Sequence, residues 1–150
     1  MRLPRFLIQQ PVRHFTDEAT ELFSRFALRH GLKYQVLDAP VEVLWAFPEQ
    51  QKLSNRIVLG LQNNDELNFG VGEFWSYFFP YLDVAVRFES LIDAWVEGRA
   101  RTVPVPGLLH QTIELQILED GEWKNAYGAG SITFKRRSPL VLKNEISSTP

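Results

Sequence analysis

The residues best suited to chemistry gather in one short aromatic stretch near the middle of the chain. Glu73 directly precedes Phe74 and Trp75, and Asp83 follows the same stretch. A carboxyl group buried against rings has a raised pKa and can then exchange a proton near neutral pH. The stretch is therefore a candidate acid/base site, with Glu73 as the acting group and His110 as the other candidate. In a simpler interpretation, Glu73 stands in water at a strand end and Asp83 only caps a helix.

The same stretch could instead serve recognition. Its aromatic residues are Phe74, Trp75, Tyr77, Phe78, Phe79 and Tyr81. Trp and Tyr join a large apolar ring to a polar atom, and they are enriched at the energetic centres of protein interfaces. Aromatic runs also fill hydrophobic cores, so both interpretations stay open. On the recognition hypothesis, the partner-binding candidates are Glu73, Trp75, Tyr77, Tyr81 and Asp83.

No motif for a metal, a cofactor or a nucleophile is found. His14, His30 and His110 are far apart, and no HxH, HxxxH or HExxH spacing occurs. His30 falls in the last turn of a predicted helix, where an imidazole interacts well with the carbonyl end. Gly128-Ala129-Gly130-Ser131 lacks the frame of a dinucleotide-binding loop. We expect no metal site and no cofactor.

Composition limits the class of protein further. The net charge is −2, and the one basic cluster is Lys135-Arg136-Arg137, so we expect no nucleic-acid partner. The chain has no cysteine, which excludes disulfides, thiolate zinc sites and cysteine nucleophiles. No window approaches the ~18 apolar residues of a membrane span, and the first residues lack a signal-peptide core. A cytoplasmic protein without membrane contact is the expectation.

Two helices must position these residues. The first is predicted over 17–30, with Thr16 as its cap, one apolar stripe, and Gly31 as a left-handed end. The second is predicted over 84–97, capped by Asp83 and stopped by Gly98. Both have a polar face opposite the apolar stripe.

The remaining elements are predicted as strands. Alternation of apolar residues marks 32–38, 41–47, 56–62, 67–71 and 113–117, and a return arm over 123–134. Asn63-Asn64-Asp65 and Asp120-Gly121 have hairpin-turn chemistry. Gly70 and Gly72 indicate a bulge or a close backbone approach. Residues 99–109 are predicted as a connection, because Pro104 and Pro106 discourage regular pairing.

This order of elements predicts the α+β class. The simplest arrangement is one antiparallel sheet of about six strands with both helices packed on it. Residues 1–140 are predicted to form a single domain, and residues 141–150 a flexible C-terminal tail.

One stretch resembles a known group of proteins. The strand DELNFGVG, the aromatic turn after it, and the helix ending in WVEGRAR are similar to small bacterial immunity-type proteins, several groups of which are families of unknown function. In many of those the turn is aromatic or His-x-His, and Trp75 and Tyr77 stand at the corresponding positions here. The resemblance covers about 40 residues. It implies an α+β, cytoplasmic, non-catalytic inhibitor that binds one toxin tightly and needs no cofactor.

Three hypotheses follow. The first is an immunity-like inhibitor that captures a toxin-like partner protein through an acidic and aromatic surface. The second is an enzyme or small-molecule-binding domain with an apolar pocket and Glu73 or His110 as the acid/base group. The third is a structural subunit, which predicts a stable homo-oligomer. The identity of the partner and the oligomeric state are not encoded in any motif.

Overall fold

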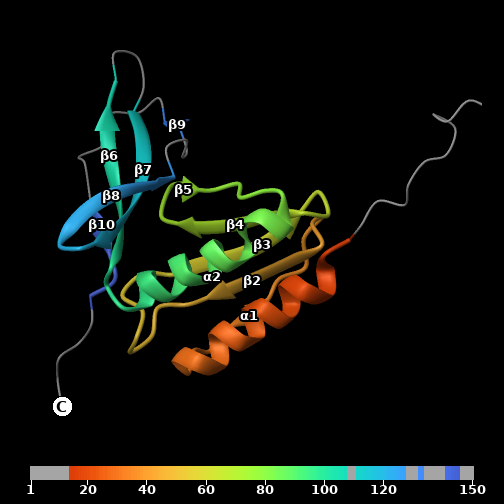
Figure 1. The fold of residues 1–150 in the computed structure, drawn as a ribbon. Helices are drawn as coiled ribbons and strands as arrows, with labels where there is room; N and C mark the ends of the chain where they lie inside the picture. The colour runs from red at the N-terminus through yellow and green to blue at the C-terminus, as the bar shows by residue number, and fades with distance from the viewer. Residues whose placement is uncertain (1–13, 108–110, 128–131, 134–140, 146–150) are drawn as a thin grey trace, which may run out of the picture.

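The computed structural model describes residues 14–107, 111–127, 132–133 and 141–145. Figure 1 shows two helices and a series of short strands in the order α1 (Thr16–His30), β1 (Gln35–Val36), β2 (Val43–Phe47), β3 (Ile57–Gln62), β4 (Glu66–Val71), β5 (Phe74–Trp75), α2 (Tyr81–Val96), β6 (Ala100–Pro106), β7 (Gln111–Glu119), β8 (Glu122–Tyr127), β9 (Ile132–Thr133) and β10 (Leu142–Lys143). None of the described helices is long and apolar enough to span a membrane.

The strands form two sheets. The first has the order β1-β2-β3-β4-β5 and the second the order β10-β6-β7-β8, with β9 beside β7. Every pairing between these strands is antiparallel. The α+β class and the antiparallel pairing are thus confirmed, but the strands divide between two sheets instead of forming one of about six.

The second sheet departs most from the sequence prediction, because the expected connection over 99–109 contains β6. This strand pairs with β7 along its whole length, Pro104 opposite Ile113 and Pro106 opposite Gln111. On its other side β10 reaches only as far as Thr102. Among the described residues, no strand pairs with this side of β6 beyond Thr102, and an edge position tolerates proline because one of its sides needs no hydrogen bonds.

Helix α1 follows the predicted stripe closely. Its buried residues are Ala19, Leu22, Phe23, Phe26 and Ala27, and Gly31 ends it in the left-handed conformation with a φ of 63°. Its start differs by one residue, since Phe15 occupies the cap position and Thr16 is already helical. No side chain caps this end, and the Phe15 backbone N–H donates instead to the Asn64 carbonyl at 3.1 Å.

Helix α2 begins earlier than predicted. Pro80 occupies the cap position in an extended conformation, after a cis Phe79–Pro80 bond. Asp83 therefore lies inside the first turn instead of capping it, where its charge favours the positive end of the helix dipole. The helix ends at Val96, and Gly98 follows with a φ of 74°.

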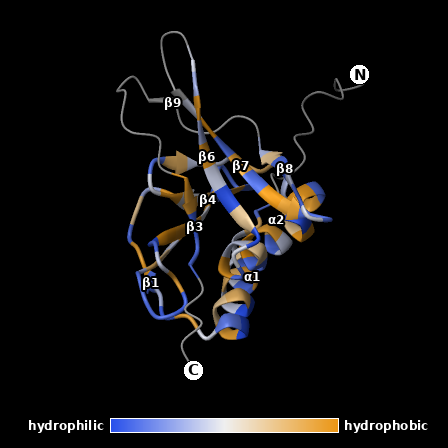
Figure 2. Ribbon diagram, turned by 90° about the vertical axis from the view of Figure 1, so that its left-hand side faces the viewer, coloured by the Kyte–Doolittle hydropathy of each residue, from blue (hydrophilic) through white to orange (hydrophobic). Residues whose placement is uncertain are grey.

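Both helices pack on one face of the first sheet (Figure 1). Alternate residues of the central strands point to them and are buried, namely Trp45, Phe47, Ile57, Leu59, Leu61, Leu67, Phe69 and Val71. At the centre, Trp95 of α2 is fully buried with its ring 5.3 Å from that of Phe69. Figure 2 shows the helices on one side of this sheet, and neither helix lies on the opposite side of β3 and β4.

The second sheet joins the same core through Ala100 and Leu115, which are both fully buried. The C-terminal segment joins it as well, so the predicted flexible tail does not begin at residue 141. Leu142 and Lys143 pair with β6, and Asn144 is only 1% exposed. The Asn144 amide donates to the carbonyls of Val96 and Lys52, and its oxygen accepts from the Ser54 backbone N–H. Residues 146–150 lie outside the described part of the chain.

Candidate functional site: the outer face of the edge strand

The aromatic stretch forms the edge of the first sheet. Val71 pairs with Phe74, Gly70 with Trp75, and Leu67 with Phe78, so the antiparallel register runs unbroken from residue 74 to residue 78. Successive side chains of a strand point to opposite faces. Within the stretch, alternate side chains therefore belong to the core and to the outer side of the sheet.

One set of alternate residues faces the helices. Phe74 and Phe78 are 2% and 3% exposed, and Ser76 between them is fully buried. The Ser76 hydroxyl accepts the Phe69 backbone N–H at 2.9 Å and donates to the Phe69 carbonyl at 3.2 Å. The Asn68 amide donates to the Ser76 carbonyl at 3.0 Å. The inner residues of the stretch are thus fixed by ring packing and by satisfied polar contacts.

The other set faces away from the helices. Trp75 is half-buried and Tyr77 is 44% exposed. They share this side of the sheet with Leu44, Ala46, Val58, Gly60, Asn68 and Gly70, and we call these eight residues the open face because no helix covers it. Ala46, Gly60, Asn68 and Gly70 are nevertheless buried, so exposure on this face is concentrated at its edge. The next residue on the outside of the chain, Phe79, is 57% exposed. Trp75 and Tyr77 therefore lie on the outer side of the sheet, while Phe74 and Phe78 fill the core beneath them.

The position of Trp75 depends on a glycine. A Cβ placed on Gly70 would lie 2.5 Å from Cε3 of Trp75 and 2.8 Å from its Cζ3. The indole therefore lies directly over the backbone of its cross-strand partner, and such contacts hold an aromatic side chain in one place. Here the glycine marks a close approach and not a bulge, so one of the two alternatives predicted for Gly70 is confirmed.

Tyr77 is fixed through its backbone. Its N–H points to the free edge of the sheet and donates to the Tyr127 hydroxyl of β8 at 3.1 Å. The Tyr127 ring also contacts the rings of Phe74 and Phe78, with centroid distances of 6.1 and 4.9 Å. The second sheet thus covers part of the edge and leaves the Tyr77 side chain outside.

The other partner-binding candidates do not all join this surface. Glu73 is exposed in the turn between β4 and β5, so the burial that an acid/base role requires is not found. Asp83 is exposed in the first turn of α2. Tyr81 is buried and stacks on Phe15 at a centroid distance of 4.6 Å, and this burial raises the pKa of its hydroxyl. His110 lies outside the described residues.

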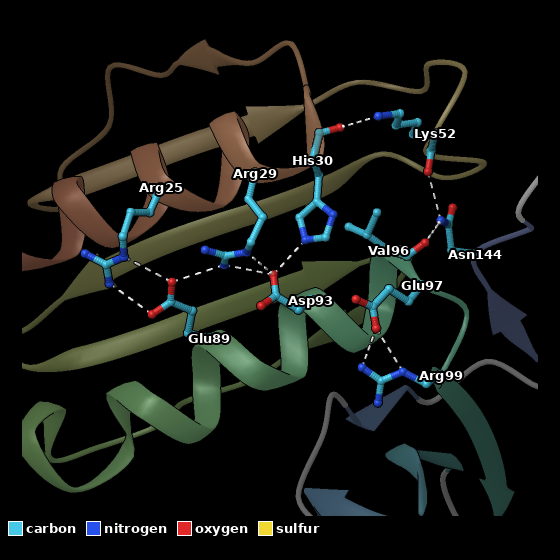
Figure 3. A network of polar contacts seen from close by, with 10 residues as sticks. All are labelled: Arg25, Arg29, His30, Lys52, Glu89, Asp93, Val96, Glu97, Arg99 and Asn144. Carbon is cyan, nitrogen blue, oxygen red and sulfur yellow. Dashed lines mark hydrogen bonds and ion pairs between the residues drawn. The ribbon is translucent and has the colours of Figure 1, made fainter.

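A network of ion pairs and hydrogen bonds joins α1 to α2, as Figure 3 shows. Arg25 donates to Glu89 at 2.9 and 3.2 Å, and Arg29 donates to both Glu89 and Asp93. The hydrogen bond from Arg25, together with that from Arg29, lowers the pKa of the Glu89 carboxyl. His30 lies in the last turn of α1, as predicted, and its Nε2 is 2.7 Å from Asp93 of α2. No cluster of His, Asp or Glu within the described ranges could hold a metal ion.

Two surface residues were missed by the sequence analysis. Phe79 was not among the partner-binding candidates, although the alternation that starts at Trp75 predicts an outward position. Arg56 precedes β3 and lies beside Trp75 at a hollow of the open face. Counting back from the Asn63–Asp65 turn would have placed Arg56 opposite Gly72, because Ile57 pairs with Val71.

Comparison of the chain with protein-family models, with curated proteins and with solved structures finds no match. Its function is therefore argued from its own geometry.

Proposed function

We propose that this protein is a non-catalytic inhibitor of the immunity type, which binds a partner protein through the outer residues of the edge strand. The observation that carries the proposal is the alternation along residues 74–78. It places Trp75 and Tyr77 outside and Phe74 and Phe78 in the core. Core packing needs the two phenylalanines, but it does not need an indole and a phenol on the far side of the sheet.

The rigidity of this surface supports the proposal. Trp75 lies against the Gly70 backbone, and the Tyr77 backbone is held by Tyr127. A ring that is already fixed, as that of Trp75 is, loses little conformational entropy on binding, which raises affinity. Large aromatic side chains with polar atoms are also the residues most often found to dominate binding energy.

The resemblance to immunity-type proteins identifies the partner to test. Such proteins are encoded beside the toxins they inhibit, so the candidate partner is the product of the adjacent gene. The order of elements that carries the resemblance, a strand, an aromatic stretch and a helix, is present as β4, β5 and α2.

The test is a binding measurement with the double variant Trp75→Ala/Tyr77→Ala. We expect its affinity for the adjacent gene product to fall by roughly a hundredfold, as for two interface hot spots. Calorimetric titration gives the affinity, and circular dichroism shows whether the domain stays folded. The matched control is Leu82→Ala/Val86→Ala, which removes two exposed apolar side chains of α2, 65% and 82% exposed. The control should bind as the wild type does.

Three outcomes would contradict the proposal. Equal losses in both double variants would move the binding surface to α2. Unfolding of the aromatic variant would assign both rings to the core. A stable homo-oligomer in light scattering that dissociates in the aromatic variant would assign the same surface to self-association, as the structural-subunit hypothesis predicts.

A further inference from the structure

A hollow of about 190 Å³ lies on the open face beside Trp75. We call it the Arg56–Trp75 hollow. It is lined by Arg56, Val58, Gly70, Val71, Gly72, Phe74 and Trp75. The Phe74 side chain is buried on the helix side, so the apolar side chains that line the hollow on this face are those of Val58 and Trp75. It adjoins the surface to which we assign partner binding.

Two glycines line the hollow, and neither position has room for a larger residue. Gly70 carries the indole of Trp75 and has no room for a Cβ. Gly72 has a φ of 57°, and a Cβ there would lie 2.7 Å from Cδ1 of Leu142. A larger residue at either position would be strained or would displace a neighbour. The floor is therefore backbone, between an aromatic wall and a guanidinium group.

The guanidinium of Arg56 differs from those of the other described arginines in its contacts. Arg25, Arg29 and Arg99 bind carboxylates, Arg101 binds Gln116 and lies over the Trp123 ring, and Arg87 lies over the Phe78 ring. Of the arginines in the described part of the chain, Arg56 alone has no acceptor and no ring contact. An exposed guanidinium with free donors is well matched to a planar carboxylate, which it can bind through two parallel hydrogen bonds.

The size of the hollow limits what it can hold. Sites for cofactors and drug-sized ligands have volumes of roughly 300–1,000 Å³. A hollow of about 190 Å³ is smaller and suits a single amino-acid side chain. Val58 and Trp75 supply its apolar side chains, while Arg56 supplies the one charged group.

These features favour an occupant that presents an apolar group and a carboxylate on adjacent atoms. An internal acidic residue brings the charge but has only a short apolar stem for the walls. The last residue of a protein chain brings both when its side chain is apolar, because the α-carboxylate is attached to the same Cα. We infer that the Arg56–Trp75 hollow binds an apolar C-terminal residue of the partner protein, with its α-carboxylate paired to Arg56 and its side chain against Trp75. This inference rests on the proposed function for the identity of the partner.

The test needs no knowledge of the partner. The probe is the peptide acetyl-Ala-Ala-Leu with a free carboxylate, titrated into the isotope-labelled protein while the Gly70 and Gly72 amide signals and the Trp75 indole signal are followed by NMR. We expect saturable shifts at these three sites. The same peptide with a C-terminal amide should bind at least roughly fivefold more weakly, as expected for the loss of one exposed ion pair.

Variants assign the effect to the guanidinium. Arg56→Gln should lower the affinity for the free acid to that for the amide. Because Arg56 is exposed and has no partner, the substitution leaves the fold intact. The matched control is Arg87→Gln, because Arg87 is also an exposed arginine but lies on α2. This variant should bind the peptide as the wild type does.

Several results would overturn the inference. One is equal binding of acid and amide, another is unchanged affinity in Arg56→Gln, and a third is the absence of shifts at the three sites. Binding of acetyl-Ala-Glu-Ala amide as tight as that of the free acid would assign the hollow to an internal acidic residue instead.

The two proposals fail separately. If the Trp75→Ala/Tyr77→Ala variant loses the partner but the peptide does not bind, the function stands and the terminal-residue inference is wrong. If the peptide binds but that variant keeps full affinity for the partner, the hollow is real and the proposed function is wrong.

Discussion

The two faces of the first sheet are built from the same strands, yet they differ in how their rings are packed and in whether their charged side chains have partners. On the helix side, rings fill the core and the helix charges neutralise one another, as Arg25 and Arg29 do with Glu89 and Asp93. On the open face, Trp75 lies over a glycine, Tyr77 is exposed, and Arg56 has no partner among the described residues. The helix side, where rings pack and charges pair, is built for stability, although the Trp95 indole N–H is buried there without an acceptor among the described residues. A face with fixed rings and an unpaired charge is suited to binding.

The largest expected difference between the two faces is in stability, and truncating neighbouring rings on opposite faces measures it. Phe74→Ala should lower the free energy of unfolding by about 3–5 kcal/mol, because it opens a cavity in the core. Trp75→Ala should cost less than about half of that, since its ring is only half-buried and water can fill the space. Urea denaturation measures both. A larger loss of unfolding free energy for Trp75→Ala than for Phe74→Ala would mean that the Trp75 ring is packed as tightly as the core.

The helix side also depends on the C-terminal segment. Asn144→Ala should cost about 1–3 kcal/mol, because the carbonyls of Val96 and Lys52 and the N–H of Ser54 lose their partner in a buried place. The neighbouring Lys143→Ala is the control and should change stability by less than about 0.5 kcal/mol. Thermal unfolding compares the two. Equal stability of both variants would show that the segment is a loose tail after all.

Gly70→Ala tests how the open face holds its indole. The added Cβ would collide with Trp75, so the ring must move. We expect a loss of roughly 1–2 kcal/mol, near the low end for overpacking, because a surface ring can swing outward. The Trp75 indole N–H signal in NMR should shift, and peptide binding in the Arg56–Trp75 hollow should weaken. An unchanged indole signal would mean that Trp75 does not rest on Gly70.

The ion pairs between the helices should give the smallest effect and depend on pH. The folded state lowers the pKa of Glu89, so this carboxylate stabilises the fold fully above its unfolded pKa of about 4.3. The contribution is lost as the pH falls through the lower folded value. Glu89→Gln should therefore be less stable than the wild type by at most about 1 kcal/mol at pH 7, and the difference should vanish in acid.

Urea denaturation between pH 7 and pH 3 measures this difference. Glu21→Gln is the control, because Glu21 is well exposed and lies 3.7 Å from Arg25. Its stability should match that of the wild type throughout. A difference for Glu89→Gln that does not change with pH would show that packing, and not charge, is responsible.

Much of the fold could be predicted from the sequence, because its signals are local. The apolar stripe of α1 and the left-handed Gly31 were identified, and so were both hairpin turns. In those turns Asn63, Asn64 and Asp120 have positive φ as predicted. The aromatic stretch was harder, since rings on both faces hide the alternation when nearly every residue is apolar. Only the pairing with β4, Gly70 with Trp75 and Leu67 with Phe78, separates the two sets.

The sequence by itself determined the helices, the turns and the antiparallel α+β class, because each depends on residues within a few positions of one another. Only the tertiary structure decided that β6 forms despite its prolines, that the strands divide into two sheets, and that Asn144 holds the end of α2. It also decided that Arg56 and Trp75 meet at one hollow. These features depend on pairing between distant segments, where burial and backbone hydrogen bonds outweigh local preference.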